Sequence, residues 1–311
     1  MPGIFDSLRL LDGPAIAERI TMRQAVDALQ QALRGGFDPD ADPPRSIVDV
    51  RHGQLLLMPS DLGAHTGQKL ATVAPANPSR GLERIQAIYV VLDAETLAPV
   101  ALLDGTELTS LRTPAVSAAV ADVVAAPDAS SLVVFGTGPQ GVRHVEAMRA
   151  IRPIDRVRFI GRDGSKAEHA VALVAASGLD AAVGTAADVA GADLVVCATT
   201  AREPLFDAAL VRDRAVVVAV GSHERGAREL PGELLGRADV IVESQRVALA
   251  EAGDVILAVA EGHLSPAALI PMARLFGGAG AEASARPVVI KTCGMGWQDL
   301  AVAQLALTDP S

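Results

Sequence analysis

The chain has 311 residues, of which 50% are hydrophobic, 21% charged and 3% aromatic, and its formal net charge at pH 7 is −10. This composition can build a large core, which argues against intrinsic disorder, and the negative charge disfavours binding to nucleic acid or anionic membranes. Two cysteines exclude a disulfide framework and a cysteine-rich metal site, and the sequence has no metal-binding motif. Apolar runs are too short to span a bilayer and no signal-peptide pattern is present, so we expect a cytoplasmic protein.

The first third of the chain predicts a helix followed by a β-rich region. Thr21 and Gln24 match a capping box, and Gly35-Gly36 ends the apolar periodicity behind it. Short β-rich segments separated by Pro, Gly, Asn and Asp then indicate an antiparallel or mixed sheet. We expect its strands at Arg45–Val50, Gln54–Met58, Lys69–Ala74, Gln86–Leu92 and Val100–Leu103. Helical spacing returns over Gly105–Val124, where Pro114 predicts a division into two helices.

From residue 131 onward, predicted strands alternate with predicted helices. This alternation is typical of a parallel, doubly wound α/β sheet, and we place the domain boundary near Thr113–Ala125. The strands are expected at Leu132–Phe135, Val157–Ile160, Ala181–Val183, Leu194–Cys197, Val216–Val220 and Val240–Val242. Composition alone does not decide whether the tail, an apolar strand at 288–290 and a helix at 295–307, closes this sheet or returns to the first domain.

A glycine-rich turn stands between the first of these strands and its helix. Gly136-Thr137-Gly138-Pro139-Gln140-Gly141 matches G-x-G-x-x-G in the strand–turn–helix context that makes this motif informative. The first glycine permits the tight turn, the second lets the backbone approach a pyrophosphate, and the third allows close helix–strand packing. We interpret all six residues as a dinucleotide-binding loop; a glycine-rich turn without a ligand is the alternative.

The end of the next strand predicts which dinucleotide is bound. An NAD site usually has an acidic residue there, whereas this chain continues Gly161-Arg162-Asp163, with Lys166 nearby. Arg162 can stack on adenine and pair with a 2′-phosphate, which favours NADP(H). Asp163 could reach the ribose instead, so NAD(H) stays an alternative.

Three cations in the first domain are candidates for binding a substrate. Arg45 and Arg112 are suited to paired hydrogen bonds with a carboxylate, and Lys69, on a short strand, could be desolvated enough to donate a proton. Taken singly, each would more commonly be a solvated surface charge.

A collinear series of motifs runs from about residue 45 to 305. It comprises Met58-Pro59, Lys69, Asp104–Thr109, Leu111–Thr113, the Gly136–Gly141 loop, Ala198–Thr200 with Pro204, Gly221, Arg228–Leu230, Val242–Ser244, Glu251–Asp254, Lys291–Gly294 and Gln298–Leu300. Together, in this order and spacing, these motifs resemble those of the ornithine cyclodeaminase/mu-crystallin family.

The resemblance implies a homodimer formed through the non-nucleotide domain, to which the C-terminal helix returns. We therefore expect a Rossmann domain over residues 114–287 and an α+β substrate-binding and dimerisation domain formed by 1–113 with 288–311. Arg45 and Arg112 would bind a substrate carboxylate in the cleft, and Lys69 would be the catalytic residue beside the reacting nitrogen. Cofactor contacts are expected from Thr113, Thr199, Val220, Gly221 and Thr292, and substrate contacts also from His223 and Cys293.

Two positions depart from the cyclodeaminases, which place a Glu where this chain has Leu56 and an Asp where it has His223. Without those carboxylates a substrate ammonium is held less well, which disfavours ornithine cyclisation. We therefore predict an NAD(P)H-dependent reductase of cyclic or small 2-imino acids, or an amino-acid dehydrogenase. The alternatives are a cyclodeaminase-type lyase and a non-catalytic protein of mu-crystallin type that binds NADPH and a small ligand. His223 could equally be an exposed loop residue.

Overall fold

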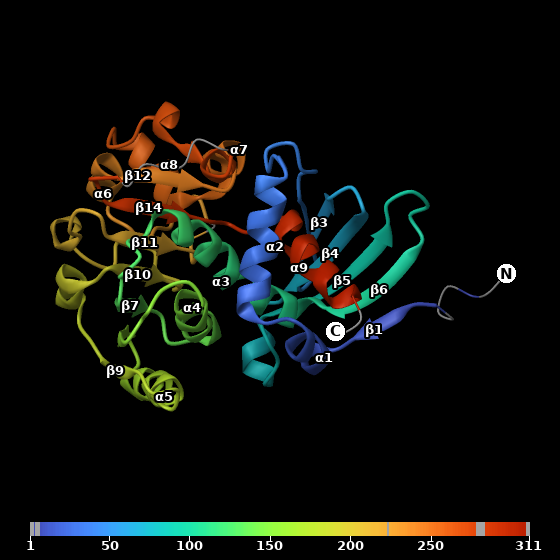
Figure 1. Cartoon of the computed structure of the whole chain (residues 1–311), viewed down its shortest axis with the longest axis horizontal. Coiled ribbons are helices and arrows are strands. Elements are labelled where there is room, and N and C mark those ends of the chain that lie inside the picture. The colour runs from blue at the N-terminus through green and yellow to red at the C-terminus, as the bar shows by residue number, and fades with distance from the viewer. Residues whose placement is uncertain (1–2, 4–6, 223, 278–283, 309–311) are drawn as a thin grey trace. The chain divides into compact units, whose positions relative to one another are not determined.

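The computed structural model describes residues 3, 7–222, 224–277 and 284–308, and the chain divides into two compact units (Figure 1). Unit 1 comprises Met1–Thr113 and Gly294–Ser311, and unit 2 comprises Pro114–Cys293. Unit 2 is therefore inserted into unit 1. Helix α3 (Gly105–Val124) continues through the first division, and the chain leaves unit 2 at Cys293.

Unit 1 is built on a six-stranded sheet of order β1-β6-β5-β4-β3-β2. The strands β2 to β6 form the expected antiparallel series, and β1, which sequence analysis did not identify, runs parallel to β6. The strands are β1 (Arg9–Leu11), β2 (Ser46–Val50), β3 (Gly53–Asp61), β4 (His65–Val73), β5 (Ile85–Asp93) and β6 (Pro99–Asp104).

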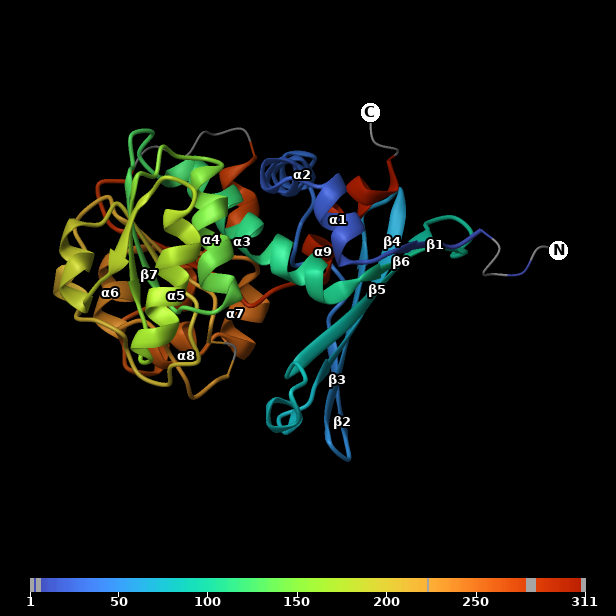
Figure 2. The same cartoon turned by 90° about the horizontal axis from the view of Figure 1, so that it is seen from below.

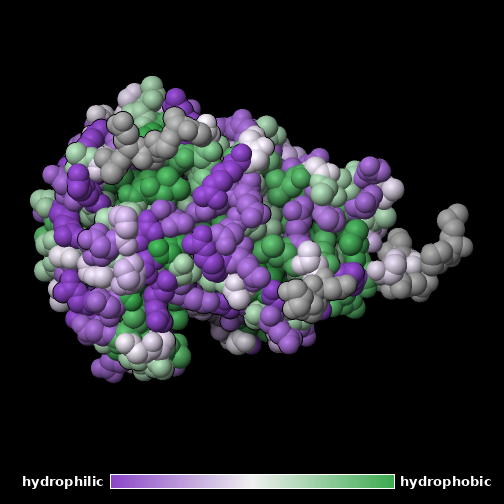
Figure 3. Space-filling model, in the orientation of Figure 1, coloured by the Kyte–Doolittle hydropathy of each residue, from purple (hydrophilic) through white to green (hydrophobic). Residues whose placement is uncertain are grey.

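Helices α1 (Gly13–Arg19), α2 (Met22–Arg34) and α9 (Gly296–Ala303) cover one face of this sheet (Figure 2). The capping box predicted at Thr21 and Gln24 is confirmed at the start of α2. α9 and the short helix η7 (Gln304–Leu307) return to unit 1, and α9 packs on β3, β4 and α2. Hydrophilic residues line the outer side of α2 (Figure 3), so this amphipathic helix forms the outer layer over α9.

The other face of the unit 1 sheet carries a group of exposed apolar side chains, and among the described residues no helix of this unit covers it. Leu57 on β3 and Ile88 on β5 lie in register with Leu70 of the strand between them, so their side chains share that face. Leu57, Ile88 and Leu10 are 36%, 45% and 71% exposed. An apolar sheet face of this kind is suited to burial against another surface.

Helix α3 corrects the prediction made at Pro114. The structure has one continuous helix over Gly105–Val124 with Pro114 inside it. Proline removes the hydrogen bond to the carbonyl of Ser110 but does not force the helix to end when packing supports both halves. Leu111 and Ala115, on either side of the proline, are almost fully buried. Packing therefore outweighs the local penalty.

Unit 2 contains a parallel eight-stranded sheet of order β13-β12-β14-β11-β10-β7-β8-β9, with helices on both faces, which confirms the predicted doubly wound fold (Figure 1). The strands are β7 (Ser131–Phe135), β8 (Arg156–Ile160), β9 (Asp180–Val183), β10 (Leu194–Cys197), β11 (Val216–Ala219), β12 (Asp239–Val242), β13 (Ile270–Pro271) and β14 (Val288–Lys291). The helices include α4 (Pro139–Arg149), α5 (Gly164–Ala175), α6 (Gly232–Arg237), α7 (Gln245–Glu251) and α8 (Gly253–Ala260).

The strand β14 corrects the expected domain limits. Residues 288–311 were all expected in the first domain, but β14 pairs with β11 and β12 inside the unit 2 sheet. Its four residues are buried and apolar except for Lys291, as a central parallel strand requires. The return to unit 1 therefore begins at Gly294.

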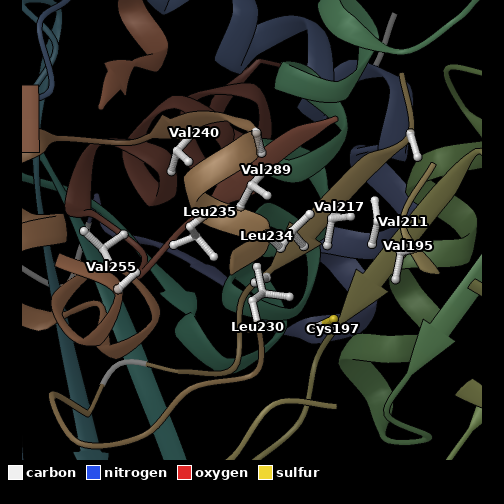
Figure 4. Packing of buried hydrophobic residues seen from close by; sticks show 14 of the residues in the cluster. Val195, Cys197, Val211, Val217, Leu230, Leu234, Leu235, Val240, Val255 and Val289 are labelled. Carbon is white, nitrogen blue, oxygen red and sulfur yellow. The ribbon is translucent and has the colours of Figure 1, made fainter. Parts of the chain in front are cut away.

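One large apolar core holds unit 2 together (Figure 4). Val195, Val217 and Val289, from β10, β11 and β14, pack against Leu234 of α6 and Val255 of α8. These side chains are nearly all small and branched, which explains how a chain with 3% aromatic residues fills its interior. No helix among the described residues is both long and apolar enough to cross a membrane.

Candidate active site

Lys69 on β4 lies on the helix-covered face of the unit 1 sheet. It is in register with the buried Met58 and Tyr89 of the neighbouring strands, so all three side chains point toward the helices. Its Nζ lies 2.7 Å from Oδ2 of Asp299 on α9 and 3.3 Å from Oγ1 of Thr109 on α3. The side chains of Lys69 and Asp299 are 3% and 0% exposed, so the ion pair is shielded from water.

Arg112 on α3 joins the same carboxylate. Its Nε lies 3.2 Å from Oδ1 of Asp299, and its Nη1 donates a hydrogen bond of 2.9 Å to Oε1 of Gln298. Gly294 has a φ of +83°, and a Cβ there would lie 2.8 Å from Arg112 Nη1, so glycine permits both the turn and the close approach. Nη1 of Arg45 donates to the carbonyl of Gly294 at 3.3 Å. The structure thus gathers all three predicted cations around the start of the C-terminal segment.

Two buried cations of this cluster, Lys69 and Arg112, share one carboxylate, Asp299, and the charge of Arg45 also acts on Lys69. Burial and the Arg112 charge together lower the pKa of Lys69 to about 8, although Asp299 acts in the opposite direction. A lysine with this pKa can exchange a proton close to neutral pH. The excess of positive charge suits an anionic ligand such as a carboxylate.

Asp42 holds the beginning of α9, which carries Asp299. It is buried, accepts a hydrogen bond of 2.8 Å from Ser60 Oγ, and accepts another of 3.2 Å from the backbone N–H of Trp297. Burial raises the pKa of Asp42 to about 6, although these hydrogen bonds oppose the shift. Asp42 therefore supports the position of the Lys69 partner without being part of the cation cluster.

In unit 2 the loop Gly136–Gly141 has the geometry that a dinucleotide requires. Gly136 has a φ of +113°, and a Cβ there would lie 2.3 Å from the Ala198 carbonyl oxygen. A Cβ on Gly141 would lie 2.1 Å from the Gly136 carbonyl oxygen, whereas one on Gly138 would meet nothing within 4 Å. Gly138 is the N-cap of α4 without a side-chain cap, and Pro139 begins the helix. The helix N-terminus thus offers backbone N–H groups and open space to a phosphate.

The other loop residues support this arrangement. The carbonyl of Gln140 lies 2.7 Å from Nδ1 of the buried His144, whose Nε2 lies 3.0 Å from Oγ of Ser117. Thr137 lies against Gly161 at the end of β8, where a Cβ would come within 2.7 Å of its methyl group. The loop is therefore packed against the strand end that carries the predicted adenosine-binding residues.

Arg162, Asp163 and Lys166 follow β8 and are exposed. Asp163 is the N-cap of α5: its Oδ1 accepts hydrogen bonds from the backbone N–H groups of Ser165 and Lys166 and, at 2.7 Å, from Ser165 Oγ. These hydrogen bonds lower the pKa of Asp163. Its carboxylate is therefore engaged within its own helix.

Thr199, Gly221 and Thr292 follow the carboxyl ends of β10, β11 and β14. The backbone N–H of Thr199 and that of Gly221 each donate 2.7 Å hydrogen bonds to Glu229, one to each carboxylate oxygen. The backbone N–H groups of Val220 and Thr292 donate to the carbonyls of Cys197 and Ala219, and that of Cys293 donates to Glu243 Oε2 at 2.7 Å. The predicted nicotinamide residues thus share one edge of the parallel sheet.

Two predicted site residues remain to be placed. His223 lies outside the described residues, and Thr113, the last residue of unit 1, is partly buried on α3. Leu56, on β3, is also partly buried. The described residues contain no group of three or more His, Cys, Asp or Glu side chains arranged to hold a metal ion.

Sequence analysis did not assign a role to Asp299, Gln298 or Glu229. All three lie within motifs that carry the family resemblance, Gln298–Leu300 and Arg228–Leu230. Membership of these motifs was the one sequence signal that could have identified them. Their partners are distant in sequence: 230 positions separate Lys69 from Asp299, and 30 separate Thr199 from Glu229.

A family model, related sequences and solved structures all place this chain among the same group of proteins. The family model described as "Ornithine cyclodeaminase/mu-crystallin family" matches residues 10–308. A Delta(1)-pyrroline-2-carboxylate reductase of Bacillus cereus is 33% identical over 303 residues, which are 92% of this chain and 91% of the relative. The structure of the Thermococcus litoralis Delta(1)-pyrroline-2-carboxylate reductase in complex with NADH and L-proline has a TM-score of 0.90 at 26% identity and 96% coverage of each chain. An archaeal alanine dehydrogenase dimer with bound NAD has a TM-score of 0.89 at 27% identity, covering 96% of this chain and 95% of its own.

Proposed function

Because this chain belongs to the ornithine cyclodeaminase/mu-crystallin family, we propose that it is an NAD(P)H-dependent oxidoreductase that reduces the C=N bond of a cyclic or small 2-imino acid. The observation that carries the proposal is the buried Lys69–Asp299–Arg112 cluster, which offers a proton donor beside a carboxylate-binding arginine. The dinucleotide loop of unit 2 and the pyrroline-2-carboxylate reductases among the relatives support it.

Arg112 and Arg45 are proposed to bind the substrate carboxylate. Arg112 is buried and already oriented by Asp299 and Gln298, so little side-chain freedom is lost when an anion binds. Arg45 is tied to the backbone at Gly294, close to the same guanidinium. Two arginines at one place fix both the position and the orientation of a planar carboxylate.

Lys69 is proposed to protonate the imine nitrogen. When bound, the reduced nicotinamide supplies a hydride to the imine carbon. Lys69, with a pKa of about 8, is largely an ammonium at neutral pH and can donate its proton to the nitrogen, so that no negative charge builds up there as the C=N bond is reduced. Asp299 holds the Lys69 Nζ in place, and solvent returns the proton to the lysine after the amino acid leaves.

We also propose that NADP(H) is preferred to NAD(H). The carboxylate of Asp163 caps α5, which leaves it poorly placed to accept hydrogen bonds from the ribose hydroxyls. The exposed Arg162 directly before it can pair with a 2′-phosphate. Two relatives have NADH or NAD in their structures, so both cofactors need to be compared directly.

The apolar sheet face of unit 1 supports a homodimer, the state named for the archaeal alanine dehydrogenase. The change Ile88→Glu places a charge in the middle of that face, where Ile88 is 45% exposed. We expect Ile88→Glu to shift the particle from dimer to monomer in analytical ultracentrifugation, because burying an unpaired charge is costly. Leu173→Glu, at an exposed leucine on α5, is the control and should stay dimeric; a monomeric wild-type protein would contradict the proposal.

The function is tested by following oxidation of NADPH and NADH with a panel of cyclic ketimine carboxylates, and of 2-oxo acids with ammonia. We expect oxidation by the wild-type protein, a fall in kcat of about 10²–10⁴-fold in Lys69→Ala, and a KM raised by about 10–100-fold in Arg112→Ala. Arg51→Ala, at an exposed arginine in the β2–β3 turn, should behave as wild type.

Two outcomes would count against a reductase. Release of ammonia from a diamino acid without net consumption of cofactor would instead support a cyclodeaminase, an activity that Leu56 disfavours. Cofactor binding without any turnover would support a binding protein.

A further inference from the structure

Glu229 is fully buried, and its carboxylate holds together two loops at the carboxyl edge of the unit 2 sheet. Glu229, in the segment between β11 and α6, accepts 2.7 Å hydrogen bonds from the backbone N–H and Oγ1 of Thr199 at Oε1, and from the backbone N–H of Gly221 at Oε2. A Cβ on Gly221 would lie 2.0 Å from the Thr199 carbonyl oxygen. The two strand-end loops are therefore in contact, and Glu229 sets their spacing.

The described groups that hydrogen-bond to this carboxylate all act as donors. The Thr199 hydroxyl accepts a hydrogen bond of 3.1 Å from the backbone N–H of Ala201, so its own hydrogen is directed to Glu229. The Gly221 N–H and the Thr199 N–H can only donate. Burial raises the pKa of Glu229, and the Asp254 charge raises it further, whereas the Lys291 charge and these donors act in the opposite direction and favour the ionised form.

Glu229 belongs to a short chain of buried charges. Oδ1 of Asp254, at the start of α8, accepts the backbone N–H groups of Glu229 and Leu230 at 2.7 and 2.9 Å. Oδ2 of Asp254 lies 3.3 Å from Nζ of Lys291, the last residue of β14. All three charged side chains are at most 1% exposed. These three groups comprise two carboxylates and one ammonium, so the group carries one excess negative charge when all three are ionised.

Buried charge of this kind is unfavourable unless an opposite charge or hydrogen bonds compensate it. In doubly wound sheets, a dinucleotide binds outside the carboxyl ends of the strands on both sides of the first strand. Here β7 is the first strand and leads into the Gly136–Gly141 loop; β8 lies on one side of it, where the adenosine would bind, and β10 and β11 lie on the other, where the nicotinamide would bind. The excess negative charge therefore lies directly behind the loops that the nicotinamide ring would contact.

We propose that Glu229 is a positioning residue that favours the positively charged, oxidised nicotinamide over the neutral, reduced ring. It acts through Thr199 and Gly221 and through its charge, and thereby assists hydride donation, during which the ring becomes positive. The inference rests on the proposed binding of a nicotinamide dinucleotide by unit 2. In this role Glu229 acts on the cofactor and does not contact the imino acid.

The test is the ratio of the dissociation constants of the oxidised and the reduced cofactor, measured by calorimetry on the complete protein without substrate. Removing one buried charge behind these loops should weaken binding of the oxidised form by roughly 10–100-fold more than that of the reduced form in Glu229→Gln. Asp213→Asn, which removes a carboxylate that is 81% exposed at the opposite end of the sheet, should leave the ratio unchanged.

A purely structural role predicts a different pattern. Glutamine turns an NH₂ group toward a backbone donor, so Glu229→Gln could weaken both cofactor forms; equal weakening with an unchanged ratio would overturn the proposal. Glu229→Asp keeps the charge but shortens the side chain, and is expected to weaken both forms while keeping the wild-type ratio. If Glu229→Gln does not fold, a changed ratio in Glu229→Asp would be the contradicting result.

This experiment is independent of turnover. Wild-type protein that binds both cofactor forms but reduces no imine would contradict the proposed reductase and leave the Glu229 inference standing. Wild-type protein that binds neither form would overturn both.

Discussion

The two units bury charge of opposite sign. In unit 1, the buried cations Lys69 and Arg112 share the carboxylate of Asp299; in unit 2, the carboxylate of Asp254 contacts the ammonium of Lys291, and Asp254 also holds the backbone of Glu229. Both arrangements contain buried ion pairs, and both keep an excess charge that a purely structural pair would not need. The positive excess matches a substrate carboxylate, and the negative excess matches a nicotinamide that becomes cationic as it gives up hydride. In each unit, the excess charge of the buried cluster is therefore opposite in sign to the charge of the ligand proposed to bind there.

The largest expected effect follows from removing the one carboxylate of the unit 1 cluster. Asp299→Ala leaves Lys69 and Arg112 buried without their shared partner, and we expect the free energy of unfolding to fall by about 3–5 kcal/mol. Denaturant titration measures this loss. Asp27→Ala, which breaks an exposed ion pair with Arg23, is the control and should change stability by less than about 1 kcal/mol. Similar values for the two variants would show that the cluster does not contribute to the stability of unit 1.

A smaller effect concerns the proton on Lys69. Only the ammonium can donate, so the rate of imine reduction should be highest below the pKa of about 8 and should fall as the pH rises through that value. Asp299 raises the pKa of Lys69, so Asp299→Asn should move the fall in rate to lower pH. A pH–rate profile of both proteins measures the shift. A profile that is flat above pH 8, or a shift to higher pH in Asp299→Asn, would contradict Lys69 as the proton donor.

The smallest effect lies on the adenosine side of unit 2, where the charges are exposed. Arg162→Ala should lower kcat/KM for NADPH by about tenfold and leave that for NADH nearly unchanged, because an exposed arginine contributes one charge-assisted contact to a 2′-phosphate. Arg143→Ala, on the neighbouring helix α4, is a control of equal charge. Equal losses with both cofactors would show that Arg162 does not select between them.

Local patterns were sufficient to predict most elements of the fold. The capping box at Thr21, the glycine-rich turn and the alternation of strands with helices in unit 2 each depend on residues close in sequence. Pro114 and β14 were misjudged because packing from distant parts of the chain decides both. The same reason explains the site: Arg45, Lys69 and Arg112 could be named from their type and motifs, whereas Asp299 gains its role only when α9 returns to unit 1.

The insertion of unit 2 into unit 1 has a consequence for synthesis of the protein. Unit 2 is continuous in sequence, so all of its strands have been made before α9 leaves the ribosome. Lys69 precedes its partner Asp299 by 230 positions, which corresponds to roughly 10–50 seconds of translation. During that interval the sheet face around Met58 and Tyr89 lacks the helix that covers it. Unit 2 can therefore fold first, and α9, which is made after it, completes both the core of unit 1 and its proton-donating pair.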